Sequence, residues 1–279
     1  MSSQFDQFLD LISVPVAPVI AWADANAHPN TVGKLLMEDG RLVWFFCLAY
    51  LVVIFGGIQV MKKREPFVLR GFSIVHNAFL VVLSGYMAYE LLRIVITTYD
   101  SPWCNDVKDG ESGAAMANVV HIFYVSKLYE FLDTIIMVLR KKEKQISFLH
   151  VYHHFSIFPY WYLISRTVPG GDAWFTAFLN SSVHVAMYSY YFCALFKIPA
   201  PWKSFITMGQ MLQFCLFLCQ AFYTYFAGCH SGAQAVIGQG LIFYALSLLV
   251  LFANFYIQSY SKPRGSTGRV TRSKAKKQE

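Results

Sequence analysis

Apolar residues are gathered into seven stretches along the chain, separated by short polar connections rich in Pro, Gly and Ser. A helix needs about 20 residues to cross a hydrocarbon core of about 30 Å, and each stretch reaches that length. The pattern therefore predicts an all-α integral membrane domain over residues 41–260. Its seven predicted transmembrane helices, or spans, cover residues 41–61, 70–98, 115–139, 146–166, 173–196, 204–227 and 234–258.

The composition agrees with a lipid environment. The chain is 56% hydrophobic and 14% charged, whereas a soluble domain carries about a quarter charged residues. Residues 1–30 do not have the pattern of a cleavable signal peptide, because Asp6 and Asp10 stand early and Pro15 and Pro18 interrupt the apolar stretch. We expect residues 1–40 to form a lumenal N-terminal segment and the first span to direct insertion.

The basic residues are distributed unevenly between the two sides of the predicted bundle. Seventeen of the 23 Lys and Arg residues fall in the connections after spans 1, 3 and 5 and in the tail, residues 261–279, and four fall on the opposite side. The positive-inside rule then places the C-terminus in the cytosol and the N-terminus in the lumen. We interpret the tail as a cytosolic anchor at the lipid bilayer rather than as a site for nucleic acid.

Two further features indicate the endoplasmic reticulum. Lys276 and Lys277 occupy the positions of a C-terminal dilysine retrieval signal, which acts on the cytosolic side. Of the six cysteines, Cys104 and Cys229 fall outside the spans, and both are placed in the lumen, where thiols are oxidised. We expect a disulfide between them, and two free thiols are the alternative.

Polar and ionisable side chains recur inside neighbouring spans, where each is costly unless it has a partner. Spacings of three and four residues place each set on one helical face. Counted from the cytosolic ends at 1.5 Å per residue, members of each set lie roughly 9 to 18 Å deep, and His76 and Asn77 of span 2 fall in the same band. The residues counted are Asp133, His153, His184, Tyr188, Gln210 and Gln213. The pattern predicts one buried polar chamber in the cytosolic half of the bundle. The sets are Lys127, Glu130, Asp133 and Thr134; His150, His153 and His154; Asn180, His184 and Tyr188; and Thr207, Gln210 and Gln213.

Structural roles also account for several of these residues. Lys127 and Glu130 fit a buried ion pair, and the glutamines of span 6 fit hydrogen bonds between helices. His76 and His121 fit hydrogen-bonded helix residues. A structural role fits the three histidines of span 4 least well, because each would need its own buried partner. Solvated lumenal positions are expected for His28 and His230.

Histidines in this arrangement suggest two kinds of chemistry. A di-iron centre, as in membrane desaturases and hydroxylases, needs more histidines than lie at this depth, unless carboxylates complete it. A single zinc ion is poorly served by three histidines that follow one another on one helix, because they cannot surround it tetrahedrally. We therefore expect no metal. The histidines at this depth are His76, His150, His153, His154 and His184.

The other chemistry uses imidazole itself. A neutral histidine nitrogen attacks a thioester and holds the acyl group while neighbouring groups move protons. Glu130 or Asp133 would then fix the tautomers of the histidines. Donors for a developing oxyanion would come from Asn180, His184 or Tyr188.

Four motifs resemble, in order and spacing, the signatures of the ELO family of fatty-acid elongases, over roughly residues 65 to 260. They are Lys127-x-x-Glu130-x-x-Asp133-Thr134, His150-x-x-His153-His154, Asn180-x-x-x-His184-x-x-Met187-Tyr188-x-Tyr190-Tyr191 and Thr207-x-x-Gln210-x-x-Gln213. The resemblance implies a condensing enzyme that joins a long-chain acyl-CoA to malonyl-CoA, releases CO₂ and CoA, and needs no redox cofactor or metal. It further implies that spans 2–7 enclose a narrow acyl tunnel, closed at its lumenal end.

The same resemblance implies roles for individual residues. His153 takes the acyl group, and His150, His154 and His184 transfer protons and stabilise the enolate. Glu130, Asp133 and Asn180 complete the catalytic set, and the phosphates of CoA suit the basic cytosolic connections. The remaining enzymes of the elongation cycle are expected partners, and a homodimer is a compatible assembly. Substrate-binding roles fall to Lys127, Tyr188, Gln210, Gln213, Thr134 and Asn77.

The segment that leads into the histidine motif is similar to members acting on polyunsaturated or very long chains. It runs from Gln145 to Leu149, and Val151 stands where members that prefer saturated and monounsaturated acids often carry Trp. Two other functions stay open on the residues alone. One is a di-iron desaturase or hydroxylase, and the other is a lipid or acyl-CoA transporter that uses the same chamber.

Overall fold

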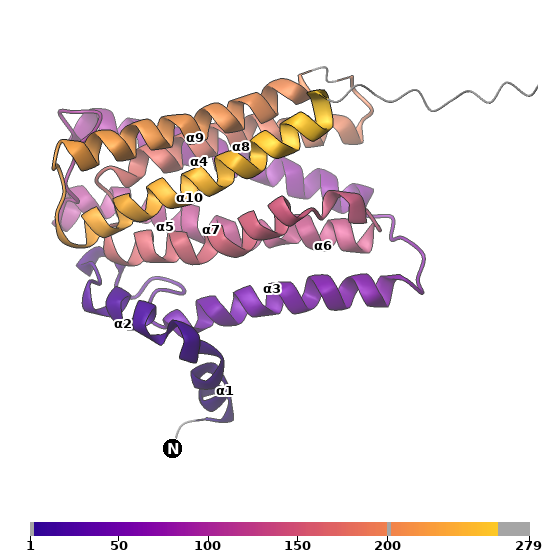
Figure 1. Ribbon diagram of the computed structural model, residues 1–279, viewed down its shortest axis with the longest axis horizontal. Helices are drawn as coiled ribbons and strands as arrows, with labels where there is room; N and C mark the ends of the chain where they lie inside the picture. The colour runs from indigo at the N-terminus through magenta and orange to yellow at the C-terminus, as the bar shows by residue number, and fades with distance from the viewer. Residues whose placement is uncertain (1–2, 200–201, 262–279) are drawn as a thin grey trace, which may run out of the picture.

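The computed structural model describes residues 3–199 and 202–261. Among these residues there is no strand. Short 3₁₀ turns link some of the helices. The basic tail and its dilysine positions lie outside the described residues. The α-helices are α1 (Gln4–Ser13), α2 (Ala17–Ala25), α3 (Gly40–Met61), α4 (Arg70–Thr98), α5 (Gly110–Tyr129), α6 (Phe131–Leu139), α7 (Phe148–Thr167), α8 (Ala173–Leu195), α9 (Lys203–Phe226) and α10 (Gly232–Tyr256). Helices α3 to α10 run side by side along the long axis of the molecule, and α1 and α2 lie at an angle below them (Figure 1).

The chain is a multi-pass membrane protein. Five helical stretches of the described residues are long and apolar enough to cross a bilayer: Gln4–Ala25, Gly40–Met61, Arg70–Thr98, Lys203–Phe226 and Gly232–Tyr260. Large apolar side chains are exposed along α3, α4, α9 and α10, as a lipid-facing surface requires.

Four of the five stretches coincide with predicted spans, and the comparison differs at two places. Gln4–Ala25 combines α1 and α2, in the segment expected to be lumenal. The spans predicted over residues 115–139, 146–166 and 173–196 form helices but are not among the five. These three helices carry most of the polar sets. The polar side chains of the predicted chamber therefore lower the mean hydropathy of the helices that carry them.

The helix predicted over residues 115–139 is interrupted at Glu130. The Glu130 N–H donates to Ser126 at 2.8 Å, and the Asp133 N–H donates back to the Glu130 carbonyl at 3.0 Å. The second bond spans three residues instead of four, so the turn is tightened and the chain continues as α6. The break lies within the first polar motif.

Packing of α3 against α7 uses a proline. Pro159 lies inside α7 and has no N–H to donate to the Phe155 carbonyl four residues earlier. The Cys47 thiol of α3 lies 3.7 Å from that carbonyl and is its donor. The carbonyl that Pro159 leaves without a donor in α7 therefore accepts a hydrogen bond from α3.

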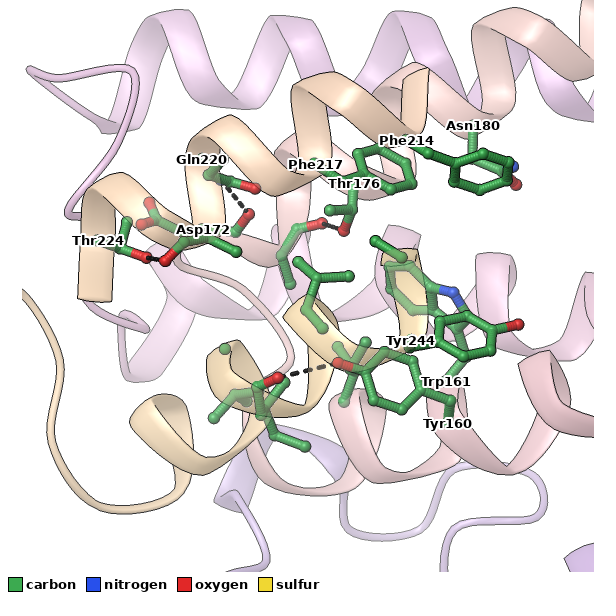
Figure 2. A pocket seen from close by; sticks show the side chains of 18 of the residues that line it. Tyr160, Trp161, Asp172, Thr176, Asn180, Phe214, Phe217, Gln220, Thr224 and Tyr244 are labelled. Atoms are coloured by element: carbon green, nitrogen blue, oxygen red, sulfur yellow. Dashed lines mark hydrogen bonds between the residues drawn. The ribbon is translucent and has the colours of Figure 1, made fainter. Parts of the chain in front are cut away.

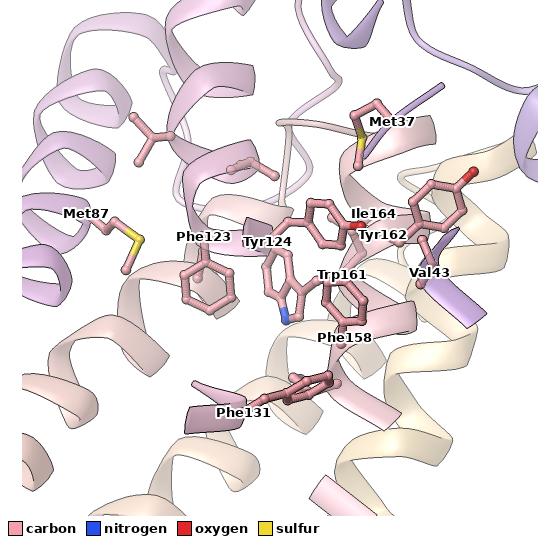
Figure 3. Close-up of a cluster of buried hydrophobic side chains, with 14 of the residues drawn as sticks. Met37, Val43, Met87, Phe123, Tyr124, Phe131, Phe158, Trp161, Tyr162 and Ile164 are labelled. Carbon is pink, nitrogen blue, oxygen red and sulfur yellow. The ribbon is translucent and has the colours of Figure 1, made fainter. Parts of the chain in front are cut away.

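The main core joins α5 to α7 through aromatic rings (Figure 3). Tyr124 and Phe158 stack with ring centroids 5.1 Å apart, and Phe123 contacts Trp161 at 4.3 Å. Offset and edge-to-face ring pairs of this kind add about 0.5–1.5 kcal/mol to the burial of their area. Aromatic side chains therefore fill the contact between α5 and α7.

Three connections meet at one end of the bundle: α4–α5, α7–α8 and α9–α10. The Asp172 carboxylate accepts the backbone N–H groups of Cys104 and Asn105 at 2.9 and 3.0 Å. Gly171 has φ +52°, and a Cβ there would lie 2.6 Å from the Asn105 carbonyl oxygen. At the other end, the Phe67 N–H donates to Leu139 at 3.0 Å and joins the α3–α4 and α6–α7 connections.

A disulfide links Cys104 to Cys229 with their Cα atoms 5.2 Å apart. It closes a loop over a sequence separation of 125 residues, which contains the histidine motif. Replacing both cysteines with serine is expected to lower the free energy of unfolding by about 2–5 kcal/mol. Thermal unfolding in detergent, with and without reductant, measures this effect. Equal midpoints for the wild type and the double variant would contradict it.

Candidate active site

The histidine motif occupies the first two turns of α7. The Ser147 side chain accepts the His150 N–H at 3.2 Å and caps the helix, which fixes where the turns begin. Three histidines therefore share one face. The ring centroids of His150 and His154 are 4.5 Å apart, and those of His153 and His154 are 5.5 Å apart.

Thr134 connects this face to two other helices. Its hydroxyl forms a 2.7 Å hydrogen bond with His150 Nε2 and a 3.1 Å hydrogen bond with the Tyr50 hydroxyl. Thr134 is fully buried, and Tyr50 comes from α3. The hydroxyl, rather than a carboxylate, orients the first histidine of the motif.

A buried ion pair lies at the α5–α6 break. Lys127 Nζ donates to Glu130 Oε1 at 2.9 Å and to Asn180 Oδ1 at 3.0 Å, and both charged side chains are at most 2% exposed. His184 Nδ1 lies 3.6 Å from the same carboxylate oxygen. Lys127 Nζ also lies 4.1 Å from the Phe123 ring centroid. The structure thus brings the first and third motifs together in a site from which water is excluded.

Asp133 binds a histidine outside the four motifs. His76 Nε2 donates to Asp133 Oδ1 at 2.7 Å, and the Tyr188 hydroxyl donates to Asp133 Oδ2 at 2.7 Å. The position of His76 in span 2 places it at this depth, but only a structural role is expected for it from the sequence. Its depth was the one signal that related it to the chamber.

The predicted carboxylate partners of the histidine motif are thus engaged elsewhere. Glu130 faces Lys127 and His184, and Asp133 faces His76 and Tyr188. His153 and His154 each have a buried Nδ1 atom with no hydrogen-bond partner among the described residues. The imidazoles nearest the cavity therefore keep a free nitrogen.

An elongated cavity begins at His153 and enters the bundle between α7, α8, α9 and α10. The space free of protein atoms there, part of which is open to solvent, is about 820 Å³. Along α7 its lining extends from His153 to Val168, roughly 22 Å at 1.5 Å per residue. Figure 2 shows Asn180 at one end and Asp172 with Thr224 at the other. Apolar rings such as Phe214 and Phe217 line the wall between them.

Only some of spans 2–7, which are expected to enclose the tunnel, contribute side chains to the lining of this cavity. Four helices line the cavity. Helix α4 packs against α8. The aromatic core between α5 and α7 adjoins the cavity, because Trp161 belongs to the core and also lines the cavity.

The far end of the cavity is polar and tightly hydrogen-bonded. His230 Nε2 donates to Asp172 Oδ2 at 2.8 Å, and the His230 side chain is 7% exposed. Gln220 donates to the Asp172 carbonyl at 3.0 Å, and Gln234 donates to the Asn105 carbonyl at 2.7 Å. These bonds join the α7–α8 and α9–α10 connections and close that end.

The expectation that His28 and His230 are solvated is therefore wrong. His230 is buried against Asp172, and His28 Nε2 lies 3.1 Å from Asp109 Oδ1 with a largely buried ring. Burial lowers the pKa of His28 from its ordinary value, and Asp109 acts in the opposite direction. Each histidine is buried against a carboxylate from a connection that is distant in the chain.

The other predicted binding residues divide into two groups. Gln213 lines the cavity, and its Oε1 atom is buried without a hydrogen-bond partner among the described residues. Gln210 Nε2 lies 3.7 Å from the Met187 sulfur, and Asn77 donates to Ser73 of its own helix at 2.7 Å. Of the three, Gln213 is the one positioned to contact a cavity ligand.

Comparison with known proteins assigns the chain to a family. The model of the ELO (GNS1/SUR4) family matches residues 35–268. Very long chain fatty acid elongase 5 of Tachysurus fulvidraco is 39% identical over 240 residues, covering 84% of this chain and 80% of that protein. The proteins of the same name from Rattus norvegicus and Homo sapiens are 40% and 39% identical over 235 residues, covering 82% of this chain and 77% of each.

The match spans both the helices that line the cavity and the polar sets around His153. The four motifs thus lie within the family region, and hydrogen bonds join the first three of them in one buried site. Gln213 of the fourth motif lines the cavity together with His153 and Asn180. The chain belongs to the ELO family and is a fatty-acid elongation enzyme.

Proposed function

We propose that the chain is a very-long-chain 3-oxoacyl-CoA synthase that works through a histidine acyl-enzyme. The observation that supports this most directly is His153, which lines the cavity and has a buried nitrogen without a hydrogen-bond partner among the described residues. An acyl chain lying in the cavity would bring its thioester carbonyl to this imidazole. Nucleophilic catalysis requires this proximity between the attacking group and the carbonyl.

The reaction divides into two half-reactions. In the first, a His153 nitrogen attacks the acyl-CoA carbonyl, the C–S bond breaks, and the imidazole proton leaves with the CoA thiol. In the second, malonyl-CoA loses CO₂, and the enolate carbon attacks the acyl group and displaces the imidazole. Lys127 and the amide of Asn180, which are joined at 3.0 Å next to the cavity, supply positive charge and a donor for the developing oxyanion.

The two ends of the cavity suit the two ends of the substrate. The apolar wall fits an alkyl chain, and the hydrogen-bonded end beyond Thr224 closes the cavity. The histidine end lies toward the α6–α7 connection, where four basic residues follow one another closely. Phosphate groups of CoA would find cations there. These residues are Arg140, Lys141, Lys142 and Lys144.

We propose seven spans, with the N-terminus in the lumen and the C-terminus in the cytosol of the endoplasmic reticulum. The meeting of the α4–α5, α7–α8 and α9–α10 connections at one end of the bundle supports this topology, because an alternating path puts them on one side. A disulfide in that group of connections suits an oxidising lumen.

Mass spectrometry tests the acyl-enzyme. Purified protein given acyl-CoA without malonyl-CoA is expected to gain one acyl mass on the peptide that contains His153 and to release one equivalent of CoA. Added malonyl-CoA should remove that mass and yield the 3-oxoacyl-CoA. A protein that forms product without any acyl adduct would overturn the mechanism, and acyl-CoA passage without product would indicate a transporter.

We further propose a preference for polyunsaturated acyl chains, supported by Val151 next to His150. Val151 packs against the main core and carries a smaller side chain than the Trp found at this position in members of the other preference. Parallel assays with polyunsaturated and saturated acyl-CoA of equal length test this. Elongation confined to the saturated substrate would reverse the assignment.

A further inference from the structure

The condensation proposed above consumes a proton inside a buried site. Acyl transfer to His153 is balanced, because the proton leaving the imidazole is carried away by the CoA thiol. The second half-reaction converts a malonyl carboxylate into CO₂ and leaves His153 without the proton it began with. Each turnover must therefore return one proton to an imidazole nitrogen in a place that water reaches poorly.

His76 and Asp133 are placed to supply it. His76 is the seventh residue of α4, and Asp133 lies six residues before the end of α6, so each is about 9 Å from its helix end on the same side of the bundle. The His76 side chain is 1% exposed, whereas the Asp133 side chain is 14% exposed. The pair thus extends from the protein surface into the buried region.

Polar side chains and imidazole rings lie between the pair and the cavity. The Tyr188 hydroxyl donates to the second oxygen of Asp133 at 2.7 Å, and the Tyr188 ring meets the His184 ring edge-on at 5.5 Å. Thr134, the next residue after Asp133, bonds to His150. From His150 the rings of His154 and His153 follow at 4.5 and 5.5 Å, and His153 lines the cavity.

A structural role alone does not explain why an ionisable pair is used here. To hold α4, α6 and α8 together, the Asp133 carboxylate needs only two donors, and an amide at position 76 would serve as well as an imidazole. Imidazole is the side chain whose ordinary pKa lies near neutrality, so it gains and loses protons most readily at the pH of the cell. Beside a carboxylate it can hold a proton without leaving an unpaired buried charge.

We propose that His76 and Asp133 form a proton-supplying pair that returns a proton to His153 during condensation, an inference that rests on the proposed acyl-enzyme reaction. As the enolate displaces the acyl group, the imidazole nitrogen takes up a proton through the neighbouring histidines. The pair regains a proton from water at the exposed edge of Asp133. His76 touches neither substrate nor His153, so it acts as a positioning and proton-storing residue.

Other titratable groups face the pair and would share in any pH dependence. The Tyr129 hydroxyl lies 3.4 Å from His76 Nδ1, and six groups interact with Asp133 electrostatically or by hydrogen bonding. These are Tyr50 of α3, Lys127 and Tyr129 of α5, His150 of α7, and Tyr188 and Tyr191 of α8.

His76→Gln tests the proposal, because glutamine keeps a donor for Asp133 but stores no proton. The acyl adduct and the first equivalent of CoA should form within about twofold of the wild-type rate, since that half-reaction needs no outside proton. Condensation of the preformed adduct with malonyl-CoA should slow by about 10²-fold, which is the lower end of the range for loss of general acid–base catalysis.

His121→Gln is the matched control and should leave both rates unchanged. His121 is a histidine of α5 whose Nε2 atom donates to the Leu35 carbonyl at 2.9 Å.

The pH profile separates proton supply from positioning. In His76→Gln the condensation rate should fall in proportion to the proton concentration as pH rises, whereas the wild-type rate should change less. Equal slowing of both half-reactions would assign His76 a structural role and overturn the proposal, as would an unchanged condensation rate. Failure of the wild type to form any acyl adduct would instead refute the acyl-enzyme reaction itself, so the two failures are distinguishable.

Discussion

Replacing His153 with alanine is expected to abolish elongation while leaving the protein folded. The imidazole lines the cavity and is the proposed acyl carrier, so its loss removes the nucleophile rather than a binding contact. Loss of a nucleophile lowers kcat by several orders of magnitude, and we expect a decrease of about 10⁴-fold or more. Turnover with acyl-CoA and malonyl-CoA measures the decrease, and intact-mass analysis should show no acyl adduct.

His121→Ala is the matched control, because it removes a membrane-embedded histidine remote from the cavity. Its activity should match the wild type. Thermal unfolding of both variants shows whether the helix bundle is intact. A His153→Ala protein that still forms the 3-oxoacyl-CoA at more than a tenth of the wild-type rate would assign the acyl group to another residue.

The second large effect is expected at the buried ion pair. Lys127→Met leaves the Glu130 carboxylate buried without its cation, and breaking one side of such a pair costs about 3–5 kcal/mol. Activity should be lost as well, because Lys127 also holds Asn180 at the cavity. Thermal unfolding in detergent and turnover measure the two effects separately.

The double variant Lys127→Met, Glu130→Gln should recover much of the stability but none of the activity, since no charge is then left unpaired. The exposed pair of Arg93 with Glu90 has the same spacing of three residues and provides a control, as Arg93 is 49% exposed. Arg93→Met should leave the unfolding midpoint unchanged. A Lys127→Met protein as stable as Arg93→Met would show that the buried pair contributes no stability.

Much of this site follows from helical spacing and depth. Residues three and four apart share a face, which places His150 beside His154 and Lys127 beside Glu130. Depth counted from the helix ends brings Asp133 near Tyr188, and the structure joins them at 2.7 Å. The four polar sets could therefore be related to one another from the sequence.

The partners of each carboxylate could not be predicted in this way. Spacing defines a face, but the rotation of α4 about its axis decides that His76, and not Asn77, meets Asp133. The burial of His230 depends on Asp172, which is 58 residues away in the chain. The position of the cavity beside the aromatic core depends on how the side chains of several helices pack, a property of packed volume that no single helix reveals.

The polarity of the helices around the site bears on how the protein enters the membrane. α5, α7 and α8 carry the ion pair, the histidines and Asn180, and none is among the five stretches apolar enough to cross on its own. Such helices lose their unfavourable contact with lipid only when their polar groups find one another. Their insertion during biosynthesis should therefore depend on their neighbours, so that the chemistry of the finished enzyme and the assembly of its transmembrane region rest on the same side chains.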